Sequence, residues 1–401
     1  MVALIVTACF VGIAVGRLPV LRMNRATIAL VGAVLVILVG GVTLPEAFAS
    51  LDLGTLALLF AVMILSVNLS YSGFFKAVAY RITRHARTRR QLLALVVVSS
   101  GVLSAVFLND TICLMLTPLV IEVRRARKLD PIPYLIALAL SANIGSAATV
   151  IGNPQNILIG AVSGVGFFHF VVRMIVPVTA SLAIVWLLVL LVHRSEFAVN
   201  ELTMAEPAPP RVYRPLLIKS LIGSGLMLLG IIIGMPTTLS ALSAAAFLLV
   251  TRRIKPERVL RDVDWTLLVF FGSLFILTAS IRSIDAYQGF VSHLSRLMSG
   301  NYFAFSALSA LFSNLISNVP AVMLLRRVIE GFADPHPWWL LLSMATTFAG
   351  NLTLLGSVAN LIVAEGARRH GIHLGFKAHL RVGIPVTLTT LAVGTTWLLL
   401  T

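Results

Sequence analysis

The 401-residue chain has few charged residues and few cysteines, and these shortages exclude several classes of protein. Charged residues make up 11% of the sequence, hydrophobic residues make up 58%, and the mean hydropathy is +0.98, which excludes a soluble globular domain. The two cysteines, Cys9 and Cys113, lie in apolar segments and indicate neither a disulfide framework nor a metal site. These features predict a membrane protein that needs no cofactor.

Catalytic and ATP-binding signatures are also missing from the sequence. It contains no H-E-x-x-H motif, no pair of catalytic acids and no nucleophile beside a base. It also contains no phosphate-binding G-x-x-x-x-G-K-[ST] motif, so ATP is not expected to drive this chain directly. We therefore predict that the protein is not an enzyme. An intramembrane enzyme is the alternative from another class.

Long apolar runs account for most of the chain. They are uniformly apolar over roughly 15–20 residues rather than alternating, which is typical of membrane-spanning helices and not of barrel strands. We predict an all-α polytopic membrane protein in the lipid bilayer of a bacterial inner (plasma) membrane, with about ten transmembrane helices. The predicted spans are residues 1–16, 26–43, 53–70, 132–165, 173–192, 215–234, 238–251, 264–281, 337–366 and 382–400.

Two further apolar stretches are interrupted near their middle by polar residues. Residues 91–123 contain the pair Asn109-Asp110, and residues 301–325 contain the sequence SNVP. Each arm is short for a full span, so we predict two re-entrant hairpins that enter and leave the membrane on one side. Amphipathic stretches that are expected to lie along the interface precede the hairpins, at residues 72–90 and 284–298.

A different interruption occurs inside the run from Pro131 to Val172, which contains no Asp, Glu, Lys or Arg. A single helix of that length would be about 60 Å long, twice the hydrocarbon thickness of a bilayer. Its centre, SANIGSAATVIGNPQN, contains helix breakers and amide side chains. Unpaired backbone groups in hydrocarbon cost several kcal/mol each, so a break is expected to line a binding cavity. We predict one broken span at 132–165 and a second at 337–366.

The two halves of the chain resemble each other. FLNDTICLML (107–116) aligns with ISNVPAVMLL (316–325), and SANIGSAATVIGNPQN (141–156) aligns with ATTFAGNLTLLGSVAN (345–360) without a gap. Each half has five predicted spans, an odd number, so the second copy enters the membrane in the opposite sense. Such an inverted-topology repeat is expected of secondary transporters. The predicted units are a first repeat at 1–193, a cytoplasmic linker at 194–214 and a second repeat at 215–401.

The distribution of basic residues predicts the orientation in the membrane. Of the 31 Lys and Arg residues, 26 fall in the predicted cytoplasmic segments and five fall outside, with both termini outside. The net charge of +16 is therefore interpreted as a topology signal, and no nucleic-acid partner is expected.

Breaks near mid-depth would expose helix N-termini, carbonyls and polar side chains to an ion or substrate. Asp110 is the only acid in the core of a hairpin or broken span. One interpretation is a coupling role, in which Asp110 binds Na⁺ or carries a proton, and the alternative is a structural acid. The asparagines either contact ligand or serve as helix caps and helix–helix bonds. No Lys or Arg is expected in the cavity. The predicted substrate- and ion-binding residues are Asn109, Asp110, Thr111, Asn143, Thr149, Gly152, Asn153, Asn156, Ser317, Asn318, Thr353, Gly356, Ser357 and Asn360.

Several of these motifs resemble those of the ion transporter superfamily, whose members carry the citrate-transporter-like domain. FLNDT and ISNVP lie where these families have hairpin-tip motifs, and IGNPQN is similar to their broken-span signature. GNLTLLGSVANLIVAEGARRHG is most similar to the arsenite-pump and P-protein branch. The resemblance implies a substrate between the hairpin tips, a homodimer and an elevator movement. It also implies two Na⁺-site regions, the first at Asn109, Asp110, Gly152 and Asn153 and the second at Ser317, Asn318, Thr353 and Gly356.

The sequence also departs from the symporter pattern. The first tip reads Asn-Asp-Thr instead of Ser-Asn-Thr, the second tip lacks its third oxygen, and GNPQN replaces a double proline. A dicarboxylate substrate and two sodium ions therefore do not follow, and the acid at the tip fits the arsenite-pump and antiporter branch. The resulting hypothesis is a secondary active transporter of a small anion or oxyacid coupled to Na⁺ or H⁺. The alternatives are arsenite or oxyanion efflux by proton antiport, a sodium/proton antiporter, and a channel.

Overall fold

The structure of the chain is a computed structural model that describes residues 1–15, 17–18, 23–127, 129–198, 209–250, 254–281 and 285–401. Helices make up most of these residues, and a short antiparallel pair of strands, β1 (Arg17–Leu18) and β2 (Met23–Asn24), precedes the second helix. The predicted all-α class is confirmed. Parts of four predicted elements lie outside the described residues: residue 16, residues 199–208, residue 251 and residue 284.

The first half of the chain contains ten helices among the described residues, of which the short α3 is not predicted from sequence. Two apolar helices and a short one precede a long helix, an amphipathic helix, two pairs of helices and a final long helix. Their bounds are α1 (Val2–Val15), α2 (Arg25–Leu38), α3 (Leu44–Ala49), α4 (Leu53–Ser72), α5 (Phe74–His85), α6 (Arg89–Val106), α7 (Asn109–Arg127), α8 (Ile132–Ser146), α9 (Pro154–Val162) and α10 (Phe167–Val192).

The second half repeats this order after the short helix α11 (Arg194–Ala198), which lies in the predicted linker. The helix that corresponds to α3 is again short, and the amphipathic helix again precedes a pair of helices. The bounds are α12 (Arg214–Ile232), α13 (Thr237–Leu249), α14 (Pro256–Arg261), α15 (Trp265–Ser280), α16 (Asp285–Met298), α17 (Tyr302–Ile316), α18 (Asn318–Glu330), α19 (His336–Ala349), α20 (Val358–Arg369) and α21 (Phe376–Leu400).

Five of the described helices are long and apolar enough to cross a membrane by length and composition: α4, α6, α10, α12 and α21. Six shorter apolar helices of 10–17 residues accompany them. One of the five, α6, is predicted as an arm of the first hairpin, and its 18 residues are at the upper end of the arm lengths that the sequence suggests. The number of crossings and the re-entrant course of the hairpins stay predictions.

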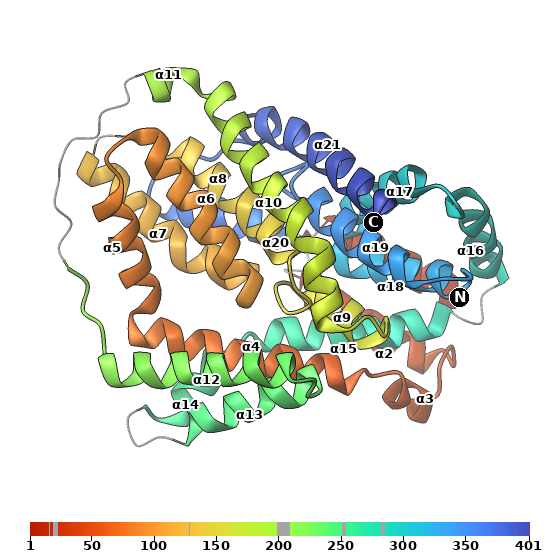
Figure 1. Cartoon of the computed structure of the whole chain (residues 1–401). Coiled ribbons are helices and arrows are strands. Elements are labelled where there is room, and N and C mark those ends of the chain that lie inside the picture. The colour runs from red at the N-terminus through yellow and green to blue at the C-terminus, as the bar shows by residue number, and fades with distance from the viewer. Residues whose placement is uncertain (16, 19–22, 128, 199–208, 251–253, 282–284) are drawn as a thin grey trace.

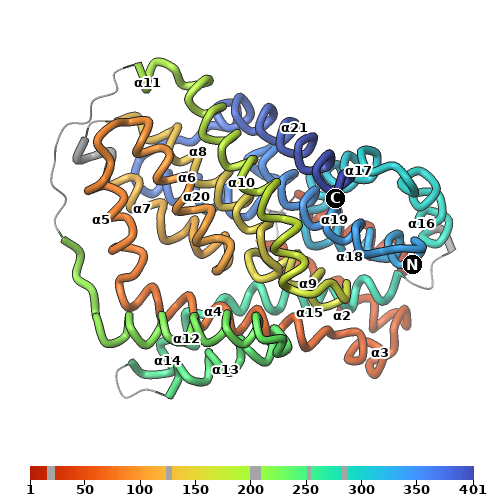
Figure 2. The backbone as a smooth tube through the Cα atoms, viewed as in Figure 1, coloured from red at the N-terminus to blue at the C-terminus, as the bar shows by residue number. Residues whose placement is uncertain are grey.

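The helices pack in two layers, which Figure 1 shows one above the other. We call α2, α4, α12, α13 and α15 the lower layer, because α4 packs against α12 and α13 while α15 packs along α2. We call α5–α10 and α16–α21 the upper layer, in which α6 packs on α8, α7 on α20, α10 on α21 and α17 on α19. Because α1 and α21 both contact α17, the two chain termini lie toward the same side of the molecule (Figure 2).

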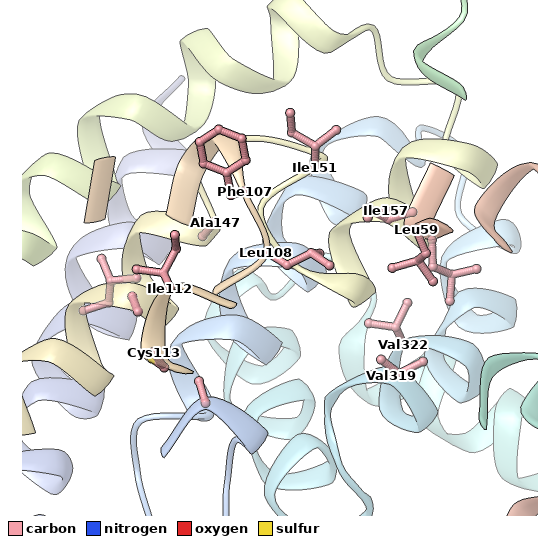
Figure 3. Close-up of a cluster of buried hydrophobic side chains, with 14 of the residues drawn as sticks. Leu59, Phe107, Leu108, Ile112, Cys113, Ala147, Ile151, Ile157, Val319 and Val322 are labelled. Carbon is pink, nitrogen blue, oxygen red and sulfur yellow. The ribbon is translucent and has the colours of Figure 1, made fainter. Parts of the chain in front are cut away.

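Apolar side chains form the contact between the layers close to the first hairpin tip. Leu59 of α4 faces Ile157 of α9, and Val322 of α18 lies beside them (Figure 3). All three side chains are fully buried. Helices α4 and α9 pack together, as do α9 and α18, so this cluster links both halves of the chain. The hairpin-tip residue Leu108 points toward this cluster, whereas Phe107 lies on the other side of the tip near Ala147 (Figure 3).

Candidate functional site

Helices α6 and α7 meet at the polar pair Asn109-Asp110, which is the predicted tip of the first hairpin. Helix α6 ends at Val106, residue Phe107 is extended, and α7 begins at Asn109. The backbone N–H of Asn109 donates to the carbonyl of Gly152 at 3.0 Å. The hydroxyl of Thr149 donates to the carbonyl of Ala105 at 2.5 Å. The tip is therefore bound at two points to the interruption of the first broken span.

That interruption covers residues 147–153, between α8 and α9, and its residues explain its shape. Pro154 occupies the first position of α9, where it has no N–H to leave unpaired. Asn153 caps the helix by accepting the N–H of Asn156 at 2.8 Å. A Cβ on Gly152 would lie 2.3 Å from the carbonyl oxygen of Ser146 and 2.6 Å from that of Ser104. Only glycine allows this close approach of three backbone segments.

The second broken span is interrupted at residues 350–357 and is braced in the same way. Asn156 donates to the carbonyls of Ser146 at 3.2 Å and Thr149 at 3.0 Å. Asn360 donates to the carbonyls of Gly350 at 2.8 Å and Thr353 at 3.0 Å, which lie at the same separations of ten and seven residues. Each asparagine thus satisfies two carbonyls that its interrupted helix leaves free.

The second hairpin tip has a different backbone. Ser317 joins α17 to α18 with φ of 83° and ψ of 155°, and it is the one positive-φ residue besides glycine in the described part of the chain. The side-chain oxygen of Asn318 accepts the hydroxyl of Ser313 at 2.7 Å. Asn314 donates to the carbonyl of Ala349 at 2.8 Å. This tip therefore contacts the end of α19, as the first tip contacts the break after α8.

Asn143 is the centre of a buried amide network that joins the two halves. Its side-chain oxygen accepts Asn109 at 2.9 Å and the hydroxyl of Ser357 at 3.0 Å. Its amide nitrogen donates to Asn351 at 2.9 Å and to Asn360 at 3.1 Å. The Asn143 side chain is 2% exposed, so these bonds form in a medium of low dielectric constant, where they are stronger than in water.

Some oxygens around the tips are buried without a hydrogen-bond donor. Among the described residues these include Oδ1 of Asn109, Oδ1 of Asn314 and the hydroxyl of Ser104. An unsatisfied buried acceptor costs about 1–3 kcal/mol unless a ligand or an ion meets it. The oxygens therefore indicate where a cation or a hydroxyl-bearing substrate would gain most by binding.

Asp110 is half-buried in the first turn of α7 and has no hydrogen-bond partner in the part of the chain that the structure describes. The positive end of the helix dipole favours a carboxylate at this position. The charged groups that act on it are Asp264, which caps α15, and Arg25 at the start of α2. The influence of Arg25 is not expected from sequence, which places this residue in a loop between two spans.

The structure groups the predicted site residues unequally. Asn109, Asn143, Ser357 and Asn360 belong to the amide network, and Thr149, Gly152, Asn153 and Asn156 shape the first break. Thr353 and Gly356 form the turn of the second break. Ser317 and Asn318 lie at the second tip, where Asn318 accepts the hydroxyl of Ser313. Thr111 is half-buried, and its side chain makes no hydrogen bond within the described part of the chain.

Several residues of the network are not predicted from sequence. Thr347 accepts the amides of Asn153 at 3.3 Å and Gln155 at 3.2 Å, and Ser343 donates to Asn156 at 2.7 Å. Asn351 follows Gly350 in the second break, and this Gly-Asn pair is the signal that could have identified it. The described residues hold no cluster of three His, Cys, Asp or Glu side chains that could bind a metal ion. The ligands that this site offers to a cation are therefore oxygens of amides, hydroxyls and backbone carbonyls and of the Asp110 carboxylate.

Comparisons with known proteins show which family the chain belongs to. Residues 2–347 match the family described as Citrate transporter. The silicon efflux transporter LSI3 of Oryza sativa subsp. japonica is 32% identical, over 94% of this chain and 92% of that protein. The putative transporter arsB of Dictyostelium discoideum is 25% identical, over 93% of this chain and 87% of that protein.

A solved structure has the same fold. The YdaH transporter of Alcanivorax borkumensis, described as having an unusual topology, superposes with a TM-score of 0.60 at 16% sequence identity. The match covers 99% of this chain and 97% of the other. Because the family matches most of the chain and the helices are apolar, the protein is an integral membrane transporter that belongs to the citrate transporter family.

Proposed function

We propose that this protein is a secondary active transporter that couples the movement of a small oxyacid, or its anion, to Na⁺ or H⁺. The observation that carries the proposal is the first hairpin tip, where the buried Oδ1 of Asn109 has no hydrogen-bond donor among the described residues and the next residue of the chain is the acid Asp110. Neutral amide oxygens and a carboxylate are the ligands that a hard cation prefers. A carboxylate inside a membrane protein can equally carry a proton.

The surroundings of this tip favour a substrate that forms many hydrogen bonds. Asn109, Asn143, Ser357 and Asn360 present amides and a hydroxyl within one connected group. Such groups can both donate to and accept from a hydroxylated oxyacid. The names of the rice and Dictyostelium relatives, a silicon efflux transporter and a putative arsB transporter, support a small oxyacid and movement out of the cell.

The division into layers supports an elevator movement. Both hairpin tips and both breaks belong to the upper layer, and Leu59 of α4 meets Ile157 of α9 in an apolar contact between the layers. Apolar contacts are non-directional, so they can be replaced by other apolar contacts as one layer slides along the other. We further propose that the protein works as a homodimer in the bilayer with both termini outside, as the resemblance and the positive-inside count imply.

Transport into proteoliposomes tests this proposal. Arsenite, silicic acid, phosphate and citrate would each be offered under a Na⁺ gradient, under a pH gradient and without either. We expect accumulation of at least one of them with one gradient only. Steady flux without a gradient would instead identify a channel, and cation exchange without any of the four compounds would identify an antiporter.

Asp110→Asn tests the role of the carboxylate in coupling. We expect the variant to lose the dependence of transport on the cation gradient, because the amide can neither ionise nor take up a proton at this site. Asp334→Asn is the matched control, since this exposed acid lies in the loop before α19. Unchanged ion dependence in Asp110→Asn would show that the coupling site lies elsewhere.

A further inference from the structure

A cleft of about 430 Å³ opens between the two layers. Residues 49–53, between α3 and α4, and the end of α15 form its lower wall, and α9, α16 and α18 form its upper wall. Its volume lies in the range of small-molecule sites. The orientation predicted from the basic residues places this cleft on the outer side, because it contains the outer arginines Arg326 and Arg327.

Most of the charged groups in the cleft already have partners. Arg326 pairs with Glu330 at 2.5 Å, one turn further along α18. Asp52 caps α4 by accepting the N–H of Thr55 at 2.9 Å, and the positive end of that helix offsets its charge. Arg327 is half-buried in the cleft and has neither an ion-pair partner nor a hydrogen-bond acceptor among the described residues.

The serine and threonine hydroxyl groups of the cleft donate to backbone carbonyls of their own segments. The Ser50 hydroxyl donates to the carbonyl of Ala47 at 2.7 Å, and the Thr278 hydroxyl donates to that of Leu274 at 2.7 Å. The guanidinium of Arg327 therefore keeps five N–H donors in a planar fork, which matches the oxygens of a carboxylate, phosphate or sulfate group. Because the cleft is partly enclosed, water screens that attraction less than it would on an open surface.

The cleft extends toward the hairpin tips. Two buried residues of its wall, Met323 of α18 and Leu158 of α9, show how close it comes. Met323 lies five residues after Asn318, and Leu158 lies five residues after Asn153. At about 1.5 Å per residue, each is within roughly 8 Å of a helix start at the binding region.

We propose that this cleft is an oxyanion-binding vestibule in which Arg327, in the last turn of α18, holds a negatively charged substrate on its way to the hairpin tips. The inference rests on the proposed transport function and narrows its substrate to the anionic form of the oxyacid or to a carboxylate. Arg327 acts as a specificity-determining residue, because a neutral acid of the same size would gain far less from the guanidinium.

Thermal unfolding of the purified full-length protein with sulfate, phosphate or citrate, at constant ionic strength and Na⁺ concentration, tests binding. We expect at least one of these anions to raise the melting temperature of the wild type, because a ligand of the folded state stabilises it by mass action. Arg327→Gln should lose the shift and Arg327→Lys should keep part of it. The matched control Arg296→Gln, which removes an exposed charge from α16 on the same side, should keep it in full.

Transport kinetics in proteoliposomes separate this inference from the proposed function. For a transported anion, Arg327→Gln should raise KM roughly tenfold with little change in the maximal rate, as loss of one charge-assisted contact predicts. The inference is wrong if no anion raises the melting temperature of the wild type. It is also wrong if Arg327→Gln and Arg296→Gln show the same anion-induced shift and the same KM while coupled transport is intact. If instead no compound is transported but the Arg327-dependent shift is present, the binding site stands and the proposed function fails.

Discussion

Gly152 lies where the first hairpin tip meets the first broken span, and its replacement by alanine tests whether this junction is as rigid as its contacts indicate. The new Cβ would lie 2.3 Å from the carbonyl oxygen of Ser146, 2.6 Å from that of Ser104 and 2.7 Å from the Cα of Ser146. All three are backbone atoms, and two different helices supply them. No side-chain rotation can relieve the overlap.

The cost of Gly152→Ala follows from two changes. Overpacking of a close-packed interior costs about 1–3 kcal/mol, and immovable backbone atoms place this site at the upper end of that range. Moving residue 152 outward also lengthens the 3.0 Å bond from the Asn109 N–H to its carbonyl. Loss of that buried bond adds about 1–2 kcal/mol. We therefore expect a loss of roughly 3–5 kcal/mol in the free energy of unfolding, together with loss of transport.

Unfolding in one detergent, compared with Gly225→Ala, would measure this loss. Gly225 lies in α12, and no atom lies within 4 Å of the position that an alanine methyl group would occupy there. Alanine at this position should be neutral or stabilising by up to about 1 kcal/mol. The assignment of Gly152 as a close-contact glycine would be refuted if Gly152→Ala transported normally and its free energy of unfolding lay within about 1 kcal/mol of the wild-type value.

Two further predictions concern a strained residue and a titrating one. Ser317→Gly should raise the free energy of unfolding by about 1–3 kcal/mol, because φ of 83° with ψ of 155° is a conformation that only glycine adopts without strain. An unchanged melting temperature would argue against stored strain at this residue. Burial raises the pKa of Glu196, although its ion pair with Arg89 at 3.0 Å opposes this shift. A raised pKa means that the folded state binds the proton more tightly than the unfolded state. The stabilisation from this proton is therefore complete below the ordinary pKa of glutamate and is lost as the pH rises through the higher folded value. Melting curves of the wild type and Glu196→Gln over this pH range should diverge, and parallel curves would contradict the prediction.

The breaks and tips could be predicted from sequence because local chemistry fixes them. Three residues of GNPQN each have one structural role. Gly152 allows the close approach of neighbouring backbone, Asn153 caps α9, and Pro154 is the first residue of that helix. Such roles depend on residues that are near neighbours in the chain, so they can be recognised in a single sequence. The same reasoning places the tips at Asn109 and Asn318.

Contacts between distant segments could not be predicted in this way. Nothing local shows that Asn143 meets Asn351, 208 residues away, or that Thr347 accepts Asn153. Local sequence places Arg25 in a loop between spans, although its charge acts on Asp110 in the structure. The cleft around Arg327 is formed by segments from both halves, so the groups that face this arginine depend on the complete fold.

The equivalent bracing of the two breaks contrasts with the asymmetry of the network between them. In the gap-free alignment Asn156 corresponds to Asn360, and both bind carbonyls at the same separations. Asn143, however, corresponds to Thr347, which lacks an amide and only accepts bonds in this network. One hub therefore serves both halves, and a substrate that meets it has a single centre of recognition rather than two equal ones. Because the hub and all its partners lie within the upper layer, substitution of Asn143 by leucine would remove the four bonds of its side chain without touching the apolar contact to the lower layer, while the bonds of Thr347 and Ser343 to the first broken span would remain.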